Sequence, residues 1–184
     1  ENGNGRIDDI EAFVDQNGDG IINSDDLVIM DAQPEPVHTL GFTTTWRYKK
    51  WSGGMTWRGE FGQYMYNNNN SLHGNFFSVG GSFPHLNNMS RDFLNTNFMF
   101  NTTEQLMSNY FIERADYVRL DNFYVAYDLG NLYKDKYPAT VNFSVQNALV
   151  FTNYSGLDPE LAGGIDNMIF PRPRVFNLQL NVTL

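Results

Sequence analysis

The last nine residues of the chain alternate without exception between apolar and polar side chains. Positions 176 to 184 read Phe-Asn-Leu-Gln-Leu-Asn-Val-Thr-Leu, with an apolar residue at every even number and an uncharged amide or hydroxyl at every odd one. Because a β-strand points alternate side chains to opposite faces, this segment predicts a strand with one apolar and one polar face. In a soluble sandwich the apolar face would point inward, whereas in a membrane barrel it would meet lipid and the polar face would line a wet lumen. The alternation alone does not choose between these two arrangements.

Four earlier segments show the same period of two, so the sequence predicts an all-β fold. The expected strands cover residues 37–50, 54–65, 112–129, 139–152 and 174–184. Within the third of these, the apolar positions change parity near Asp121 and Asn122. Such a change of phase predicts a β-bulge at that point.

The connections between the expected strands alternate strictly between long and short. Residues 1–36, 66–110 and 153–170 are long connections, whereas 49–54 and 130–138 are short. Bacterial outer-membrane barrels have long extracellular loops and short periplasmic turns, and a sandwich has no reason to follow this rule. The pattern therefore favours an antiparallel transmembrane β-barrel, and a periplasmic C-terminus would place all three long segments, residues 1–36 included, outside the cell.

Composition excludes several other classes. The 184 residues include no cysteine, so disulfides and thiolate metal sites are absent, and the net charge of −9 argues against a nucleic-acid partner. No run of 18 apolar residues occurs, so we expect no membrane helix. The first residues contain neither an initiator methionine nor a signal peptide, from which we expect a piece of a longer protein.

Residues 15–26 fit the twelve-position calcium loop, with oxygen-bearing side chains at positions 1, 3, 5, 9 and 12 and glycine at position 6. Aspartate stands at position 12, where the EF-hand prefers glutamate, so the loop is closer to the dockerin type. Residues 2–11 fit positions 3 to 12 of a second such loop that lacks its first carboxylate. The alternative is a cluster of Asx turns without metal. The expected calcium ligands are Asp15, Asn17, Asp19, Ile21 (through its carbonyl), Asn23 and Asp26.

Catalysis has little support in the sequence. His38, His73 and His85 are scattered, and no nucleophile stands at a telling distance from a base. We therefore expect a protein that is not an enzyme.

Three further motifs give the chain a family resemblance. They are residues 111–123 (Phe-Ile-Glu-Arg-Ala-Asp-Tyr-Val-Arg-Leu-Asp-Asn-Phe), residues 146–160 (Gln-Asn-Ala-Leu-Val-Phe-Thr-Asn-Tyr-Ser-Gly-Leu-Asp-Pro-Glu) and Pro171-Arg172 before the terminal strand. Together with residues 15–23 and the following Pro34, Pro36 and Gly41, they resemble SusC/RagA-type TonB-dependent outer-membrane transporters. Leu184 departs from the aromatic residue that usually ends that family.

The resemblance implies the C-terminal part of a barrel of about 22 strands. It further implies a plug and the remaining barrel strands as partners, a SusD-like surface lipoprotein as a lid, the TonB complex as energy source and outer-membrane lipid around the barrel. The cargo would be oligosaccharides or peptides. We expect loop aromatics and a histidine to contact this cargo by stacking, and the candidates are Phe76, Phe77, Phe83, His85, Phe93, Phe98 and Tyr154.

The leading alternative is a secreted carbohydrate-binding β-sandwich that carries a dockerin-like calcium module. It requires the apolar faces of the strands to be buried in a sealed interior.

Overall fold

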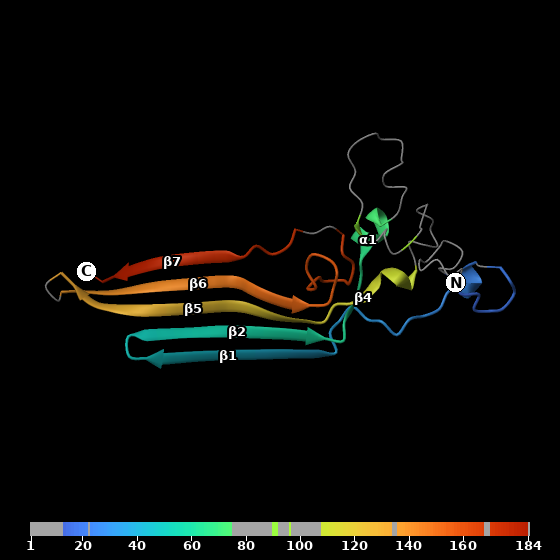
Figure 1. Ribbon diagram of the computed structural model, residues 1–184. Coiled ribbons are helices and arrows are strands. Elements are labelled where there is room, and N and C mark those ends of the chain that lie inside the picture. The colour runs from blue at the N-terminus through green and yellow to red at the C-terminus, as the bar shows by residue number, and fades with distance from the viewer. Residues whose placement is uncertain are drawn as a thin grey trace, which may run out of the picture. The chain divides into compact units, whose positions relative to one another are not determined.

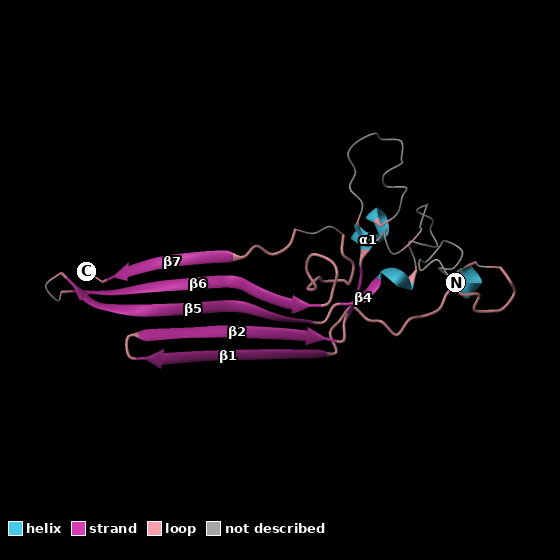
Figure 2. Cartoon of the chain, in the orientation of Figure 1, coloured by secondary structure: helices cyan, strands magenta, loops and turns pink. Residues whose placement is uncertain are grey.

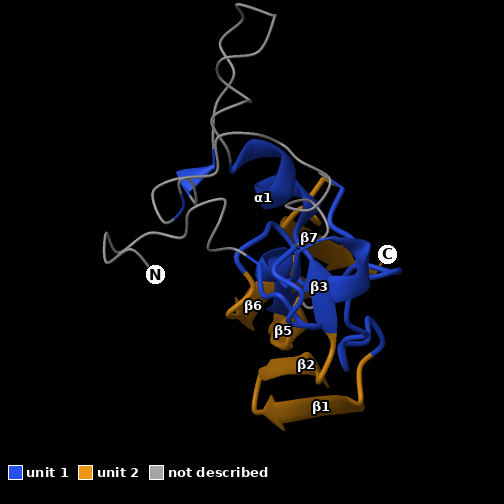
Figure 3. Ribbon diagram, turned by 90° about the vertical axis from the view of Figure 1, so that its right-hand side faces the viewer, with its two compact units in different colours: residues 1–35, 64–114, 155–169 blue, residues 36–63, 115–154, 170–184 orange. Residues whose placement is uncertain are grey.

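A computed structural model describes residues 13–21, 23–74, 90–91, 96, 108–133, 136–167 and 170–183. The chain divides into two compact units, coloured separately in Figure 3. We call them the loop unit (residues 1–35, 64–114 and 155–169) and the sheet unit (residues 36–63, 115–154 and 170–184). Each is described by itself below.

The sheet unit is built on one antiparallel sheet with the strand order β1-β2-β5-β6-β7 (Figure 1). Its strands are β1 (His38–Tyr48), β2 (Trp51–Phe61), β5 (Tyr117–Leu132), β6 (Tyr137–Thr152) and β7 (Val175–Val182). The prediction of an antiparallel all-β fold is thereby confirmed. Closure into a barrel is not seen, because β1 and β7 are the two edges of the sheet formed by the described residues.

The register of the sheet sorts side chains by polarity across all five strands. Because residues opposite each other in an antiparallel pair point to the same face, a row of partners shares one face. One such row runs through Trp46, Gly53, Val125, Phe143 and Leu178. The next row, on the opposite face, runs through Thr45, Gly54, Tyr124, Ser144 and Asn177. The sheet therefore has an apolar face and a polar face, as the alternation predicts.

The bulge predicted near Asp121 is confirmed. The register of β5 against β6 shifts between Leu120 and Asn122, and that of β2 against β5 shifts between Thr56 and Trp57. The extra residue allows Leu120 and Phe123, which differ in parity, to lie on the same apolar face.

Both tight turns of the sheet unit lie at the same end of the sheet (Figure 2). Lys49 and Lys50 join β1 to β2, and residues 133–136 join β5 to β6. The last strand, β7, also runs toward this end, as its antiparallel pairing with β6 requires. We call it the short-turn end, and the long connections begin at the other end of the strands.

The predicted strands 54–65 and 112–129 are each divided in the structure. β2 ends at Phe61 and β5 begins at Tyr117, while β3 (Tyr64–Tyr66) and β4 (Ile112–Arg114) form a separate two-stranded sheet in the loop unit. The break after β2 lies at Gly62, whose φ of 89° is outside the strand region. Its backbone N–H donates to Oδ1 of Asp116 over 2.6 Å, which holds the chain in this turn.

The loop unit contains more regular structure than the irregular segment expected over residues 66–110. Helix α1 (Asn68–His73) begins after Asn67, whose side chain accepts a hydrogen bond from the backbone N–H of Asn70. Among the described residues of this unit, 3₁₀ helices cover Ser24–Asp26 (η1) and Asn109–Phe111 (η3). None of the helices in the described ranges has the length and apolar character that a membrane crossing needs.

Candidate functional site

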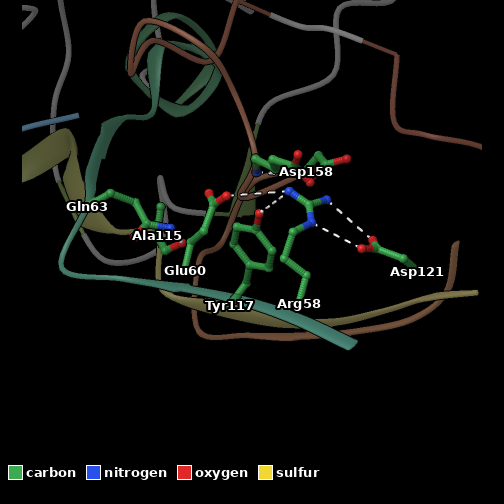
Figure 4. A network of polar contacts seen from close by, with 8 residues as sticks. Arg58, Glu60, Gln63, Ala115, Tyr117, Asp121 and Asp158 are labelled. Carbon is green, nitrogen blue, oxygen red and sulfur yellow. Dashed lines mark hydrogen bonds and ion pairs between the residues drawn. The ribbon is translucent and has the colours of Figure 1, made fainter. Parts of the chain in front are cut away.

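The polar face of the sheet carries a cluster of charged and phenolic side chains around Arg58 (Figure 4). The Arg58 guanidinium donates from Nε to Asp121 Oδ2 over 3.1 Å and from Nη2 to Oδ1 over 3.3 Å. Its Nη1 donates to the Tyr117 hydroxyl over 3.0 Å and lies 3.4 Å from Glu60 Oε1. Asp121 is the residue that the bulge inserts, so the irregularity in β5 supplies the partner of Arg58 on β2. These contacts hold the charged side chains of Arg58, Glu60 and Asp121 in fixed positions on the polar face.

A second polar group ties the start of β7 to the bulged part of β6. Asn147 has a φ of 50° and accepts a 2.6 Å hydrogen bond from Arg119 Nη1 on its Oδ1. Its Nδ2 donates to the carbonyl of Arg172 over 2.7 Å. Arg119 is 2 % exposed, so this interaction is shielded from water. The contacts hold the Pro-Arg-Pro-Arg segment beside β6.

The loop unit contains a pocket of about 480 Å³, a volume within the usual range for small-molecule sites. Its lining combines two aromatic residues with one amide, two serine hydroxyls and one residue of each charge: Asn70, Ser90, Arg91, Tyr110, Phe111, Glu113 and Ser155.

The polar wall of this pocket is held by a continuous hydrogen-bond network. Oε1 of Glu113 accepts from Asn67 Nδ2 over 2.9 Å and from Ser155 Oγ over 2.7 Å, and its Oε2 accepts from the Ser155 backbone N–H over 2.9 Å. Asn70 donates to Ser155 Oγ over 3.3 Å and accepts from Ser90 Oγ over 2.6 Å. These hydrogen bonds hold the polar groups of the wall in fixed orientations. The sequence reasoning missed this pocket, although the Asn-rich run 67–70 was a usable signal.

Six of the seven residues that the sequence predicts to contact cargo lie outside the described part of the chain. They are Phe76, Phe77, Phe83, His85, Phe93 and Phe98. Tyr154 belongs to the sheet unit and is 5 % exposed, which leaves little of its ring for a ligand.

Two carboxylates of the expected calcium loop, those of Asp15 and Asp26, accept hydrogen bonds from backbone N–H groups of the same segment. Asp15 accepts from the N–H groups of Gly18 and Gly20 over 2.6 and 2.7 Å. Asp26 accepts from the N–H groups of Asn23 and Gln16, each over 2.8 Å. These two donors, with Asn23 the larger cause, lower the pKa of Asp26 below its usual value, because they stabilise the carboxylate.

The side chains of the loop have the oxygen chemistry that calcium prefers. However, no three acidic or histidine side chains among the described residues come together as a metal-binding group. Ile22 and the half-motif at residues 2–11 lie outside the described part of the chain. Calcium binding by this loop therefore stays a prediction that the residue types favour.

Comparison with known proteins relates most of the chain to one class of receptor. No family model matches. The TonB-dependent receptor SusC of Bacteroides thetaiotaomicron is 32% identical over 176 residues, which cover 92% of this chain and 17% of that receptor. The TonB-dependent receptor P3 of Formosa agariphila is 26% identical over 196 residues, covering 94% of this chain and 19% of the relative.

Solved structures agree on the fold. The RagAB peptide transporter matches with a TM-score of 0.66 at 24% identity, over 83% of this chain and 18% of that chain. The RagAB peptide importer in the open-open state matches with a TM-score of 0.69 at 20% identity, over 89% and 19% of the two chains.

The 184 residues thus span less than a fifth of the relatives that they match. The homology points to TonB-dependent transporters, which are not enzymes, and it confirms the resemblance carried by the sequence motifs. Over most of its length, the chain is homologous to a fragment of the SusC/RagA-type TonB-dependent receptors.

Proposed function

We propose that this chain supplies the C-terminal barrel strands and exterior loops of a TonB-dependent outer-membrane importer of oligosaccharides or peptides. The observation that carries the proposal is the sorting of polarity across five strands in a chain homologous to such receptors. In this function the apolar face meets hydrocarbon, and the polar face lines the transport path.

The dimensions of the sheet suit an outer membrane. The 11 residues of β2, from Trp51 to Phe61, extend about 34 Å at about 3.4 Å per residue. A strand of this length tilted by about 45° rises about 24 Å, close to the apolar band of about 25 Å on outer-membrane barrels.

Exposure of the apolar face supports the barrel over the sandwich. Phe42, Phe176 and Leu178 are each more than half exposed. A sandwich would bury these side chains against a second sheet. Exposed apolar area of this kind marks a surface that meets another apolar phase.

The open edges of the sheet indicate partners. Neither β1 nor β7 has a second neighbour among the described residues, and unpaired strand edges are not tolerated in lipid. The remaining strands of the barrel would pair with both edges. The homology supports the further partners of such a receptor: a plug, a SusD-like lipoprotein and the TonB complex.

We assign the loop-unit pocket as a candidate cargo contact, beside the loop aromatics expected from the sequence. Its aromatic rings can stack on a sugar or an apolar peptide side chain, while its amide and hydroxyl groups accept and donate hydrogen bonds. Tyr110→Ala should weaken cargo binding and Tyr110→Phe should preserve most of it. Leu157→Ala is a control, because Leu157 lies in the same unit and does not line the pocket.

We also propose that residues 15–26 bind calcium and thereby stiffen an exterior loop. Terbium, which takes the same oxygen ligands, should bind the full-length receptor, and Asp15→Asn should weaken this binding. Protease cleavage within residues 15–26 should increase after chelation while the strands stay intact. Unchanged cleavage after chelation would remove the calcium proposal.

Uptake by living cells tests the transport function itself. Deletion of the full-length receptor should abolish uptake of one labelled oligosaccharide or peptide class, and loss of TonB should have the same effect. The receptor should fractionate with the outer membrane. Recovery of the receptor in the soluble fraction, or unchanged uptake of every labelled cargo, would refute the proposal.

A further inference from the structure

The short-turn end of the sheet carries one lysine in an unusual backbone conformation. Lys49, the first residue of the tight turn after β1, has a φ of 54°, in the left-handed region. Glycine adopts this conformation without steric cost, and a lysine does not. Residues in such sparsely populated conformations cluster at functional sites, and this motivates a functional role for the lysine.

The ammonium of Lys49 lies on the apolar side of the sheet. Its Nζ is 5.2 Å from the centroid of the Tyr48 ring, and Tyr48 pairs with Trp51 in a row of the apolar face. Tyr48 is 65% exposed and Trp51 47% exposed. Trp51 also contacts the ring of Tyr127 at a centroid distance of 4.6 Å. A positive charge therefore stands beside a group of exposed rings on the face that we assign to lipid.

The neighbouring Lys50 adds a second positive charge at this end. Its Nζ lies 3.8 Å from the position that a Cβ would take on Gly130, and its carbonyl accepts the backbone N–H of Asp128. Oδ1 of Asp128 accepts a hydrogen bond from the backbone N–H of Gly130 over 2.8 Å. Lys50 is therefore placed next to the end of β5.

The second tight turn repeats the combination of an exposed ring and a lysine. Tyr133 is 72% exposed and also has a positive φ, of 45°, and Lys136 follows in the same turn. Rings with a polar tip prefer a membrane interface, and lysine stems reach from apolar surface toward charged headgroups.

We propose that the short-turn end is a binding site for the phosphate of an anionic glycerophospholipid. The acyl chains lie along the apolar face, the rings of Tyr48 and Trp51 lie at the interface, and the ammonium groups of Lys49 and Lys50 contact the phosphate. The chain has a net charge of −9, so this attraction is local to the turn and not a property of the whole chain. The proposal rests on the proposed function, because it requires the sheet to lie in a bilayer.

The proposed phosphate site can be tested by measuring how much lipid the full-length receptor retains. The delipidated receptor in neutral detergent is offered phosphatidylglycerol or phosphatidylcholine, and bound lipid is counted by native mass spectrometry. We expect preferential retention of phosphatidylglycerol. Lys49→Gln and Lys50→Gln should each lower it about fivefold, the effect of one lysine near an anionic surface. Arg47→Gln is the matched control, because it removes the same charge on the opposite face of β1 and should leave retention unchanged.

Lys49→Gly separates lipid binding from a structural role. Glycine relieves the left-handed strain, so stability should stay equal or rise while lipid retention falls as in Lys49→Gln. Equal retention of the two lipids, wild-type retention in both Lys49 variants, an equal loss in Arg47→Gln, or displacement of the lipid by millimolar inorganic phosphate would each overturn the proposal. A receptor that fails to enter bilayers contradicts the proposed function, whereas one that inserts without lipid preference contradicts only this inference.

Discussion

Replacing Phe143 by arginine tests which face of the sheet meets lipid. Phe143 lies near the middle of β6, in a row of the apolar face, and its ring stacks on Phe176 with centroids 6.5 Å apart and planes 25° apart. An arginine facing lipid at the bilayer midplane costs about 2–4 kcal/mol, and loss of the ring pair adds about 0.5–1.5 kcal/mol. We therefore expect Phe143→Arg to lower the free energy of unfolding by about 2.5–5.5 kcal/mol.

The assay is urea unfolding of the full-length receptor after refolding into phosphatidylcholine vesicles, followed by tryptophan fluorescence. Ser144→Arg is the matched control, because Ser144 is the next residue of β6 and belongs to a row of the polar face. Its guanidinium stays in the wet lumen, so the loss should be under about 1 kcal/mol. An equal or larger loss in Ser144→Arg would refute the reasoning.

Three other predictions follow from particular contacts. Arg58→Leu should lower the free energy of unfolding by about 1 kcal/mol in the same urea titration. The reason is that the two hydrogen bonds from Arg58 to Asp121 join side chains that are about 30% exposed to water. A loss above about 3 kcal/mol would contradict this and indicate an ion pair that is shielded from water. Gly62→Ala should destabilise more than Gly130→Ala, although both residues have positive φ. The added Cβ would clash with the Val37 side chain at 2.8 Å in the first variant, whereas in the second it would lie 3.8 Å from the flexible Lys50 ammonium, an ordinary contact. Equal losses would show that the local contact is unimportant. Because the folded loop lowers the pKa of Asp26, that carboxylate stabilises the loop above the ordinary pKa of 3.8, and this contribution is lost as the pH falls below it toward the folded value. Hydrogen exchange in residues 15–26 should therefore be faster at pH 3 than at pH 5, after correction for the intrinsic rate, and Asp26→Asn should remove the difference.

Local periodicity predicts the faces of the sheet but not the breaks in its strands. The parity of apolar residues around Asp121 was sufficient to predict the bulge, because both sides of the phase change lie in one stretch of sequence. The break at Gly62 depends on a hydrogen bond to Asp116, 54 residues away. The alternation of apolar and polar residues within β2 therefore cannot predict this break.

The candidate sites divide in the same way. The loop at residues 15–26 is a contiguous motif, so its candidate calcium ligands can be named from the sequence alone, and calcium binding stays a prediction. The pocket cannot be predicted in this way, since its wall joins Asn67 to Ser155 across 88 residues and Glu113 to Ser155 across 42. Only the fold brings those polar groups together.

Spin labels on β7 test the central claim most directly. The chain contains no cysteine, so single substitutions Leu178→Cys and Gln179→Cys introduce unique attachment points in this part of the receptor. In the full-length receptor reconstituted into liposomes, the label at 178 should be relaxed mainly by oxygen, which concentrates in hydrocarbon, and the label at 179 by a water-soluble nickel complex. Reversed preferences, or equal access of the nickel complex to both labels, would contradict the assignment of the apolar face to lipid.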